Sequence, residues 1–440
     1  MQLKKNDIFI ARAIDYTTTA QAVVKQDDFV FFVEGLLVGE VAKLKVLKVK
    51  KNFGFAKIVE LIEESRDRCI DRRDIGLDIS HMSYDHQIEF KRNSVINELR
   101  YHGIDIEVDD VIKSDNIFNY RNKAVVPVRV INGRVEIGFF RKRSHNLVPV
   151  DDFIIHDREI DKVLFYLRDL FSDAVDEIYD EESRRGNINY FLVRRSQETK
   201  EVMIVIIGKK SNLKNQNYYV DRIKREVKNL VSLYYHCQKD HSNVILSGIS
   251  KKLYGRDNFR EIILGREFEV GPESFLQINT QAMNKLYSKA IELLNLDRED
   301  VVIDAFCGIG SIGLSLADRV KKVYGYELNR EAINYAKINA KKLGIYNSTF
   351  KVCDANKELL ENRDANILIV DPPRKGLEKE ALNSINSSKV EKMIYISCNP
   401  STLARDLKIL SDSFSIESIT PVDLFPNTHH VEALVLMTRE

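Results

Sequence analysis

The chain has 440 residues, enough for two to four domains, and its 67 basic and 66 acidic side chains leave a formal net charge of +1. This balance excludes a uniformly basic nucleic-acid-binding protein, so any basic surface has to be local. The five cysteines are scattered, which suits a reducing cytoplasm. The sequence has no apolar run near the ~20 residues of a membrane span and no signal-peptide pattern. We therefore expect a cytoplasmic protein that does not bind membranes, and we expect it to be a monomer.

Residues 5–62 predict a small five-stranded β-barrel. Five short alternating runs, from IFIARAIDY to GFAKIVELI, are separated by Asp, Gly and Asn. In the fourth run Lys43, Lys45, Lys48 and Lys50 alternate with apolar residues, which places the lysines on one face. Two interpretations fit equally: an exposed edge strand protected by lysines, or a strand that faces an oligonucleotide.

The middle of the chain mixes helices and strands. A polar stretch at 65–74 is typical of a linker, and Ser83 predicts the N-cap of a helix that ends at Gly103. Strand-like segments then alternate with an acidic helical stretch at 157–180, and a further helix is expected at 218–236. Three basic groups, which usually mark solvated surface, form an RNA-binding patch only if they converge: Arg141-Lys142-Arg143, Arg184-Arg185 and Arg194-Arg195.

After about residue 285 the chain shows strand–loop–helix repeats, typical of a doubly wound α/β domain. Gly308, Gly310 and Gly313 follow a buried strand and satisfy G-x-G-x-x-G. Glu327 ends the next strand, at the ~20-residue spacing of a carboxylate that binds ribose hydroxyl groups. The pattern fits a dehydrogenase, a methyltransferase that uses S-adenosylmethionine (SAM), or a packing turn.

Three reactive side chains come at or next to the ends of later strands. Asp371 begins Asp-Pro-Pro-Arg, whose prolines stiffen a turn that a dehydrogenase does not need. Cys398 follows the strand YIS, and Glu432 lies in the otherwise apolar strand HHVEALVLM. Each alone has an ordinary explanation, since buried cysteines usually pack and a strand glutamate usually lies at the surface. Together, on a sheet with a ribose-binding loop, they indicate an active site at the carboxyl edge.

The segments DAFCGIGSIGL, DPPRKGL, YISCNPSTLARDL, FPNTHHVEALVLM and SFLQIN resemble motifs of the RNA uracil-C5 methyltransferases. HMSYDHQIEFKR and FNYRNKAVVPV are similar to blocks of that family's central region. The first barrel is similar to the TRAM domain of the ribosomal-RNA branch, including FVFFVEGLLVGE. The resemblance implies a TRAM/OB-fold barrel at 1–64, an α+β RNA-binding domain at 65–270, and a class I, Rossmann-like SAM methyltransferase domain at 271–440.

The resemblance also implies the chemistry. Cys398 would add to C6 of uracil as a nucleophile, with its direction set by Asn399 and Pro400. Glu432 would then remove the proton from C5 after methylation. Because the thiol has to reach C6, the target uridine would be extruded from its fold.

Matching positions imply the residues around the cofactor SAM and the base. Glu327 would bind the ribose hydroxyl groups. Phe306 stands where the family often has Tyr, and Ser311 where Asn is expected; neither change threatens cofactor binding. Arg374 fits an RNA contact and a salt bridge equally well. The full set of expected cofactor-binding residues is Gln277, Phe306, Ser311, Glu327, Asp354 and Asp371.

One departure from the family concerns its iron–sulfur cluster, which many members hold with four cysteines. Cys69 is present, but Ile75 and Asp78 occupy the next two positions and Phe153 aligns with the last. One thiolate cannot hold such a cluster. We therefore expect no cluster and no metal, with hydrophobic packing or a salt bridge in its place.

The resemblance favours 23S ribosomal RNA as substrate, because the tRNA T-loop enzymes of the family are expected to lack the barrel. Whether one or two uridines are modified stays open. Three alternatives are a tRNA uracil-C5 methyltransferase, a cytosine-C5 RNA methyltransferase and a non-catalytic RNA-binding protein. The combination of SCNP and HVE argues against the second, and the presence of both Cys398 and Glu432 argues against the third.

Overall fold

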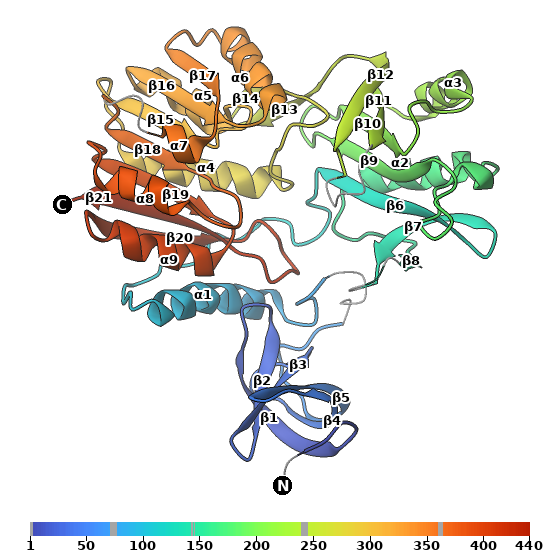
Figure 1. The fold of residues 1–440 in the computed structure, drawn as a ribbon, viewed down its shortest axis with the longest axis vertical. Helices are drawn as coiled ribbons and strands as arrows, with labels where there is room; N and C mark the ends of the chain where they lie inside the picture. The colour runs from blue at the N-terminus through green and yellow to red at the C-terminus, as the bar shows by residue number, and fades with distance from the viewer. Residues whose placement is uncertain (1–2, 71–76, 142–143, 145, 239–244, 360–363) are drawn as a thin grey trace. The chain divides into compact units, whose positions relative to one another are not determined.

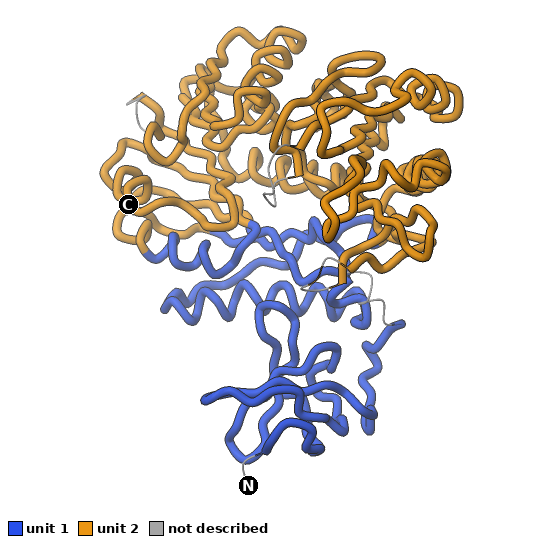
Figure 2. The backbone as a smooth tube through the Cα atoms, turned by 45° about the vertical axis from the view of Figure 1, so that its right-hand side comes forward, with its two compact units in different colours: residues 1–117, 398–408, 418–433 blue, residues 118–397, 409–417, 434–440 orange. Residues whose placement is uncertain are grey.

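A computed structural model describes residues 3–70, 77–141, 144, 146–238, 245–359 and 364–440 (Figure 1). The chain forms two compact units, shown in Figure 2. Unit 1 comprises Met1–Ile117, Cys398–Lys408 and Ser418–Ala433, and unit 2 comprises Phe118–Ser397, Ile409–Glu417 and Leu434–Glu440. The boundaries of the three expected domains stay a prediction. Within the described part of the chain, no helix is long and apolar enough to cross a membrane.

The N-terminal strands close into a barrel in the order β1-β2-β3-β5-β4. They are β1 (Ile8–Tyr16), β2 (Gln21–Gln26), β3 (Phe29–Glu34), β4 (Val41–Val49) and β5 (Phe53–Glu63). Alternate residues point inward, and Val24, Phe31, Leu44 and Val46 are completely buried in the core. The barrel closes because β3 and β5 pair in parallel while the other neighbours are antiparallel. The predicted five-stranded barrel is confirmed.

Closure removes one interpretation of the lysine-bearing strand. β4 pairs with β1 on one side and with β5 on the other, so it is not an edge strand. Lys43 and Lys45 alternate with the buried Ala42 and Leu44. A shift of register between Val46 and Lys48 then changes the alternation, and the lysines stay outside. Protection of an edge therefore does not explain them.

The first long helix, α1 (Tyr84–Tyr101), confirms the helix predicted to begin after Ser83. The Ser83 side chain accepts a hydrogen bond from the backbone N–H of His86, and Gly103 follows with a φ of 75°. The helix expected at 157–180 is shorter. It spans α2 (Arg158–Leu170) and ends in a turn, as the following Ser and Asp residues favour.

A seven-stranded sheet in the order β12-β11-β10-β9-β6-β7-β8 forms the middle of the chain. Its strands are β6 (Lys123–Ile131), β7 (Arg134–Phe140), β8 (Leu147–Pro149), β9 (Ile188–Arg195), β10 (Val202–Gly208), β11 (Leu230–Gln238) and β12 (Gly248–Gly255). Helix α2 packs its apolar side against this sheet, with Leu164, Leu167 and Phe191 completely buried. An antiparallel hairpin follows, β13 (Phe259–Ile263) with β14 (Arg266–Val270).

The helix predicted at 218–236 is wrong in its second half. The chain forms α3 (Gln216–Glu226) and then enters β11. The helix ends at Val227, whose backbone is already extended (φ −86°, ψ 106°), and Asn229 then turns the chain with a φ of 57°. The next residues, LVSLYYHC, are rich in the β-branched and aromatic types that fit a buried strand.

The basic groups of this region do not form one surface patch among the described residues. Arg194 is 2% exposed, and its guanidinium donates a hydrogen bond to the carbonyl of Ser274 at 2.6 Å. Arg195 forms an ion pair with Asp157 at 2.6 Å. Arg184 and Arg185 are exposed, and Lys142 and Arg143 lie outside the described residues.

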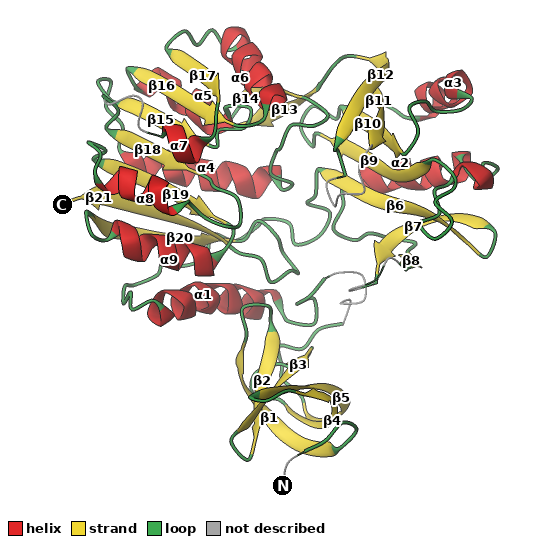
Figure 3. Ribbon diagram, in the orientation of Figure 1, coloured by secondary structure: helices red, strands yellow, loops and turns green. Residues whose placement is uncertain are grey.

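A second seven-stranded sheet follows the order β17-β16-β15-β18-β19-β21-β20 (Figure 3). Its strands are β15 (Val301–Ala305), β16 (Lys322–Glu327), β17 (Ser348–Val352), β18 (Ile367–Val370), β19 (Lys392–Ser397), β20 (Phe414–Val422) and β21 (Glu432–Arg439). The helices between them are α4 (Thr280–Leu294), α5 (Ser311–Leu316), α6 (Arg330–Lys342), α7 (Ala355–Glu358), α8 (Lys379–Asn386) and α9 (Pro400–Leu410). The five strands from β17 to β19 pair in parallel. The strand order reverses at β15, and open α/β sheets bind ligands at such a reversal. This sheet confirms the predicted doubly wound α/β class.

Candidate active site

The glycine-rich turn lies at the carboxyl end of β15, where the strand order reverses. Gly308 and Gly310 have φ values of 55° and 78°, and Phe306 has a φ of 62°. Gly313 lies against the strand, because a Cβ at this position would be 2.8 Å from Oδ2 of Asp304. The glycines therefore permit a tight turn and a close approach of α5 to β15, as a nucleotide-binding turn requires.

Asp304 is a buried carboxyl group beneath this turn, and sequence analysis did not single it out. It is 2% exposed, and its Oδ2 accepts a hydrogen bond from the backbone N–H of Gly313 at 2.9 Å. Desolvation raises the pKa of Asp304 to about 7, and the nearby charges of Asp371 and Glu327 act in the same direction. The available signal was an aspartate in an otherwise apolar strand, VVIDA.

Glu327 ends β16, the strand next to β15, as predicted. Its Oε2 accepts a hydrogen bond from the backbone N–H of Gly308 at 3.3 Å. Its Oε1 accepts one from the backbone N–H of Asn329 at 2.8 Å. The carboxylate therefore lies beside the glycine turn, where a ribose-binding group has to be.

Two more predicted aspartates follow parallel strands at this edge of the sheet. Asp354, just after β17, caps α7 by accepting a hydrogen bond from the backbone N–H of Asn356 at 3.1 Å. Asp371 directly follows β18, and desolvation raises its pKa to about 7. Ser311, the first residue of α5, is buried. Together with Phe306, these residues are grouped by the topology of unit 2 around the glycine turn.

Gln277 lies in unit 2, in the loop before α4, and buried polar contacts fix its backbone. Its carbonyl accepts a hydrogen bond from Nδ2 of Asn122 at 3.0 Å, and the backbone N–H of Asn122 donates to the carbonyl of Ile278 at 2.8 Å. Asn122 Nδ2 also donates to Oγ1 of Thr280, whose hydroxyl donates to Glu261. Sequence analysis missed Asn122 and Glu261, because only the fold brings them to this loop.

Cys398 directly follows β19 and is partly exposed. The next residue, Asn399, caps α9. Its Oδ1 accepts a hydrogen bond from the backbone N–H of Ser401 at 3.2 Å, and its carbonyl accepts one from the backbone N–H of Leu403 at 3.0 Å. Pro400 occupies the first helical position, where its missing N–H costs no hydrogen bond. The cap fixes the backbone next to the thiol, and the positive end of the helix dipole favours an anion there.

Glu432 is the first residue of β21 and is 2% exposed. Its neighbours Val431 and Ala433 are buried as well. A carboxylate shielded from bulk water in this way suits proton transfer. Cys398 and Glu432 both belong to unit 1, whereas the six expected cofactor residues belong to unit 2.

The residues at the four positions where the family has cysteine ligands do not suit an iron–sulfur cluster. Cys69 is an exposed free thiol, and the Asp78 carboxylate lies 2.8 Å from Nδ1 of His429. Phe153 is completely buried in the core of the central sheet and stacks on His156. Ile75 lies outside the described residues. Elsewhere in the described chain, no group of three or more His, Cys, Asp or Glu side chains is placed to hold a metal ion.

Comparison with known proteins gives one family for most of the chain. The model of the tRNA (uracil-5-)-methyltransferase family matches residues 83–440. An uncharacterized RNA methyltransferase of Streptococcus agalactiae is 38% identical over 99% of this chain and 100% of its own length. A protein of the same description from Clostridium tetani is 36% identical over 99% of this chain and 97% of its own.

A solved structure is also similar over nearly the whole chain. The tRNA (uracil-54, C5)-methyltransferase of Pyrococcus abyssi, in complex with S-adenosyl-L-homocysteine, matches with a TM-score of 0.78 and 26% identity. The match covers 97% of this chain and 99% of that one, so only about 13 of the 440 residues here stay unmatched. The barrel is therefore within the match. The expectation that tRNA enzymes lack this module is wrong for that protein.

Proposed function

Because the chain belongs to the tRNA (uracil-5-)-methyltransferase family, we propose that it methylates C5 of uridine in RNA with SAM as methyl donor. The family match over 83–440 carries this proposal. The S-adenosyl-L-homocysteine bound to the Pyrococcus abyssi enzyme is the demethylated form of SAM and supports the choice of donor. The glycine turn and Glu327 fit a nucleoside-bearing cofactor.

The proposed reaction uses covalent catalysis. The Cys398 thiolate adds to C6 of uracil and pushes electron density onto C5, which is otherwise a poor nucleophile. SAM supplies the methyl group as an electrophile. Glu432 then accepts the proton of C5. The electrons of that C–H bond re-form the 5,6 double bond, and the thiolate leaves as methyluridine is released.

The cofactor-binding roles follow the same proposal. Glu327 would bind the ribose hydroxyl groups, and Asp354 would line the cofactor pocket. Gln277, Phe306, Ser311 and Asp371 would line the rest of the cofactor and base pocket. The geometry of the glycine turn supports the role of Glu327, because its carboxylate accepts a hydrogen bond from the backbone of the turn.

We propose 23S ribosomal RNA as the substrate, because the barrel's sequence, including FVFFVEGLLVGE, resembles that of the ribosomal branch. A tRNA T-loop is the second candidate, favoured by the match to the Pyrococcus abyssi tRNA enzyme. Since that match includes the barrel, the barrel by itself does not separate the two substrates. In either RNA the target uridine has to leave its stack before a thiol reaches C6.

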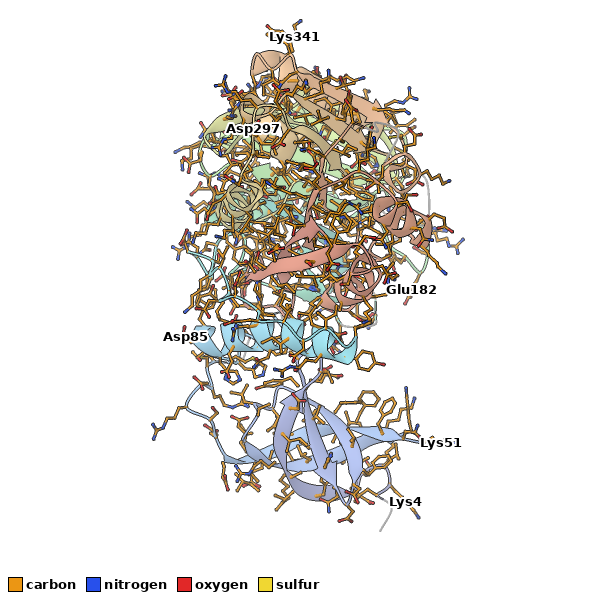
Figure 4. The ribbon with its side chains drawn as sticks, turned by 90° about the vertical axis from the view of Figure 1, so that its left-hand side faces the viewer. Lys4, Lys51, Asp85, Glu182, Asp297 and Lys341 are labelled. Atoms are coloured by element: carbon orange, nitrogen blue, oxygen red, sulfur yellow. The ribbon has the colours of Figure 1, made fainter. Side chains whose placement is uncertain are left out.

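The outside of the barrel supplies an RNA-binding surface that the sequence indicated only by its lysines. Phe32, Phe53 and Phe55 are partly exposed and pack together, with ring centroids 5.4 to 5.9 Å apart. Nζ of Lys50 lies 4.9 Å from the centroid of Phe53. The next residue in the chain, Lys51, is exposed, and Figure 4 shows it on the barrel. Aromatic rings next to lysines bind unpaired bases by stacking and phosphates by charge. We call these four side chains, Phe32, Lys50, Phe53 and Phe55, the barrel patch.

The function is tested by methylation of unmodified transcripts. Purified protein is incubated with SAM and either 23S rRNA or tRNA, and 5-methyluridine is mapped by mass spectrometry. We expect product in 23S rRNA and none with Cys398→Ala, whose SAM affinity should change less than about twofold because the thiol acts on the base. Product in tRNA alone would select the second candidate. Methylation by Cys398→Ala, or of neither RNA, would overturn the proposal.

A further inference from the structure

We infer that Gln87 and Lys91, on the buried face of α1, are positioning residues for the proton acceptor Glu432. The inference rests on the proposed function, because it needs Glu432 as the base. Both residues belong to HMSYDHQIEFKR, a block that the proposed chemistry leaves without a role. Their partners lie in residues 423–431, the loop that leads directly into Glu432, and all of these residues belong to unit 1.

Lys91 forms a completely buried ion pair with Asp423. Nζ of Lys91 lies 2.5 Å from Oδ1 of Asp423, and neither side chain is exposed. The same ammonium donates to the carbonyl of Phe425 at 3.0 Å. The hydroxyl of Tyr84, about two helical turns before Lys91, donates to Oδ2 of Asp423 at 3.0 Å. Both carboxylate oxygens and the start of the loop are therefore fixed by α1.

Gln87 makes a two-way contact with Asn427, four residues further along the loop. Its Nε2 donates to Oδ1 of Asn427 at 3.1 Å, and the backbone N–H of Asn427 donates to its Oε1 at 2.8 Å. Asn427 has a φ of 66°, so the chain turns sharply at this contact. The Asn427 side chain also donates to the carbonyl of Ile117 at 2.7 Å. A fixed turn thus lies five residues before Glu432.

A third contact lies nearer to Glu432. Nδ1 of His429 is 2.8 Å from Oδ2 of Asp78, and the backbone N–H of Ile79 donates to the carbonyl of Asn427 at 3.2 Å. The loop has no helix or strand between 423 and 431. Side-chain contacts to α1 and to the segment before it therefore define its course.

These contacts suit positioning better than stabilisation. A buried ion pair is weak evidence for stability, because an apolar pair of similar volume stabilises a core at least as well. What the polar contacts add is direction: each fixes one atom of the loop to one atom of α1 or of the segment before it. A base has to meet its proton within hydrogen-bonding distance, so a small displacement of Glu432 slows proton removal.

The test follows the covalent intermediate, which persists when proton removal is slow. Gln87→Leu and the double variant Lys91→Met with Asp423→Asn change the side-chain volumes little and leave no buried charge unpaired. The RNA transcript methylated by the wild-type protein is supplied with SAM, and the protein–RNA adduct is measured on denaturing gels. Glu432→Gln serves as the reference for full trapping, and Asn93→Ala, at an exposed site on α1, serves as the control.

We expect Gln87→Leu and the double variant to lower kcat by about tenfold to a hundredfold and to accumulate adduct. SAM affinity and the control variant should stay at the wild-type level. A purely structural role would lower Tm without raising the adduct fraction of the folded protein, and this result would overturn the inference. If Glu432→Gln itself forms no adduct, the assignment of the base fails, and the inference fails with it. If only the α1 variants form none, the proposed function stands and the inference alone is wrong.

Discussion

Asp304, Asp371 and Glu261 are carboxyl groups whose pKa values are raised to about 7, chiefly by desolvation. Each is held in unit 2 by the strands or loops around the glycine turn and Gln277. Near neutral pH these groups change charge, so the electrostatic potential of the candidate cofactor site depends on pH. Burial of a carboxyl group costs free energy. Carboxyl groups with such raised pKa values are common at functional sites and rare in ordinary hydrophobic cores.

The raised pKa of Asp304 predicts a dependence of stability on pH. Because the folded state holds the proton between about pH 4 and pH 7 and the unfolded state does not, the free energy of unfolding falls as pH rises through this range. Asp304→Asn keeps an acceptor for the N–H of Gly313 and removes the titration. In this variant the decrease of the free energy of unfolding with pH should become smaller, by up to about 1.4 kcal/mol per pH unit.

This prediction is checked by urea unfolding between about pH 5 and pH 7. Glu299→Gln is the control, since the Glu299 side chain is 81% exposed and its removal should leave the slope unchanged. An unchanged slope in Asp304→Asn would show that Asp304 ionises normally in the folded protein.

At the scale of elements, the barrel patch predicts separable effects on RNA binding. Phe55→Ala should weaken RNA binding by about 1–3 kcal/mol without changing its salt dependence, because stacking involves no counterions. Lys50→Ala should reduce the slope of log K against log salt by about one phosphate contact.

Both effects are measured by titrating labelled RNA at several salt concentrations. Ile8→Ala removes an apolar side chain that is even more exposed than Phe55, on β1 and outside the barrel patch, and this variant should bind normally. If Phe55→Ala and Ile8→Ala bind RNA alike, the patch does not contact RNA.

Sequence signals identified those elements whose boundaries are set locally. Ser83 and Gly103 mark α1 because a helix cap and a left-handed turn depend on neighbouring residues. The helix expected at 218–236 failed because burial between β10 and β12 decides the state of LVSLYYHC. Periodicity of a short apolar run does not reveal such burial.

The same limit applies to the candidate site. Glu327 and Asp371 were predictable, because parallel strands end at one edge of a sheet and each residue follows or ends such a strand. Asn122, Glu261 and the pair Gln87–Asn427 were not. The last two residues are 340 positions apart, and only the folded chain brings their amide groups together.

At the scale of the whole molecule, we predict that the purified protein carries no iron. Cys69 supplies one thiolate, and Phe153 fills the position of another ligand with a buried ring. Metal analysis should find far less than one iron per chain, without broad absorption near the visible edge. Cys69→Ala should change the free energy of unfolding by less than about 0.5 kcal/mol, as expected at an exposed site. Stoichiometric iron would contradict the prediction.

The composition of unit 1 has a consequence for synthesis of the chain. Its barrel and α1 are made long before the partners of Lys91 and Gln87, because residues 423 and 427 follow 332 and 340 positions later in the chain. Until then the nascent protein exposes an unneutralised ammonium and an unsatisfied amide on α1, both groups that water can still solvate. The α1 region should therefore mature only after residues 423–427 have been made, and a stop codon before them should harm the first hundred residues as well.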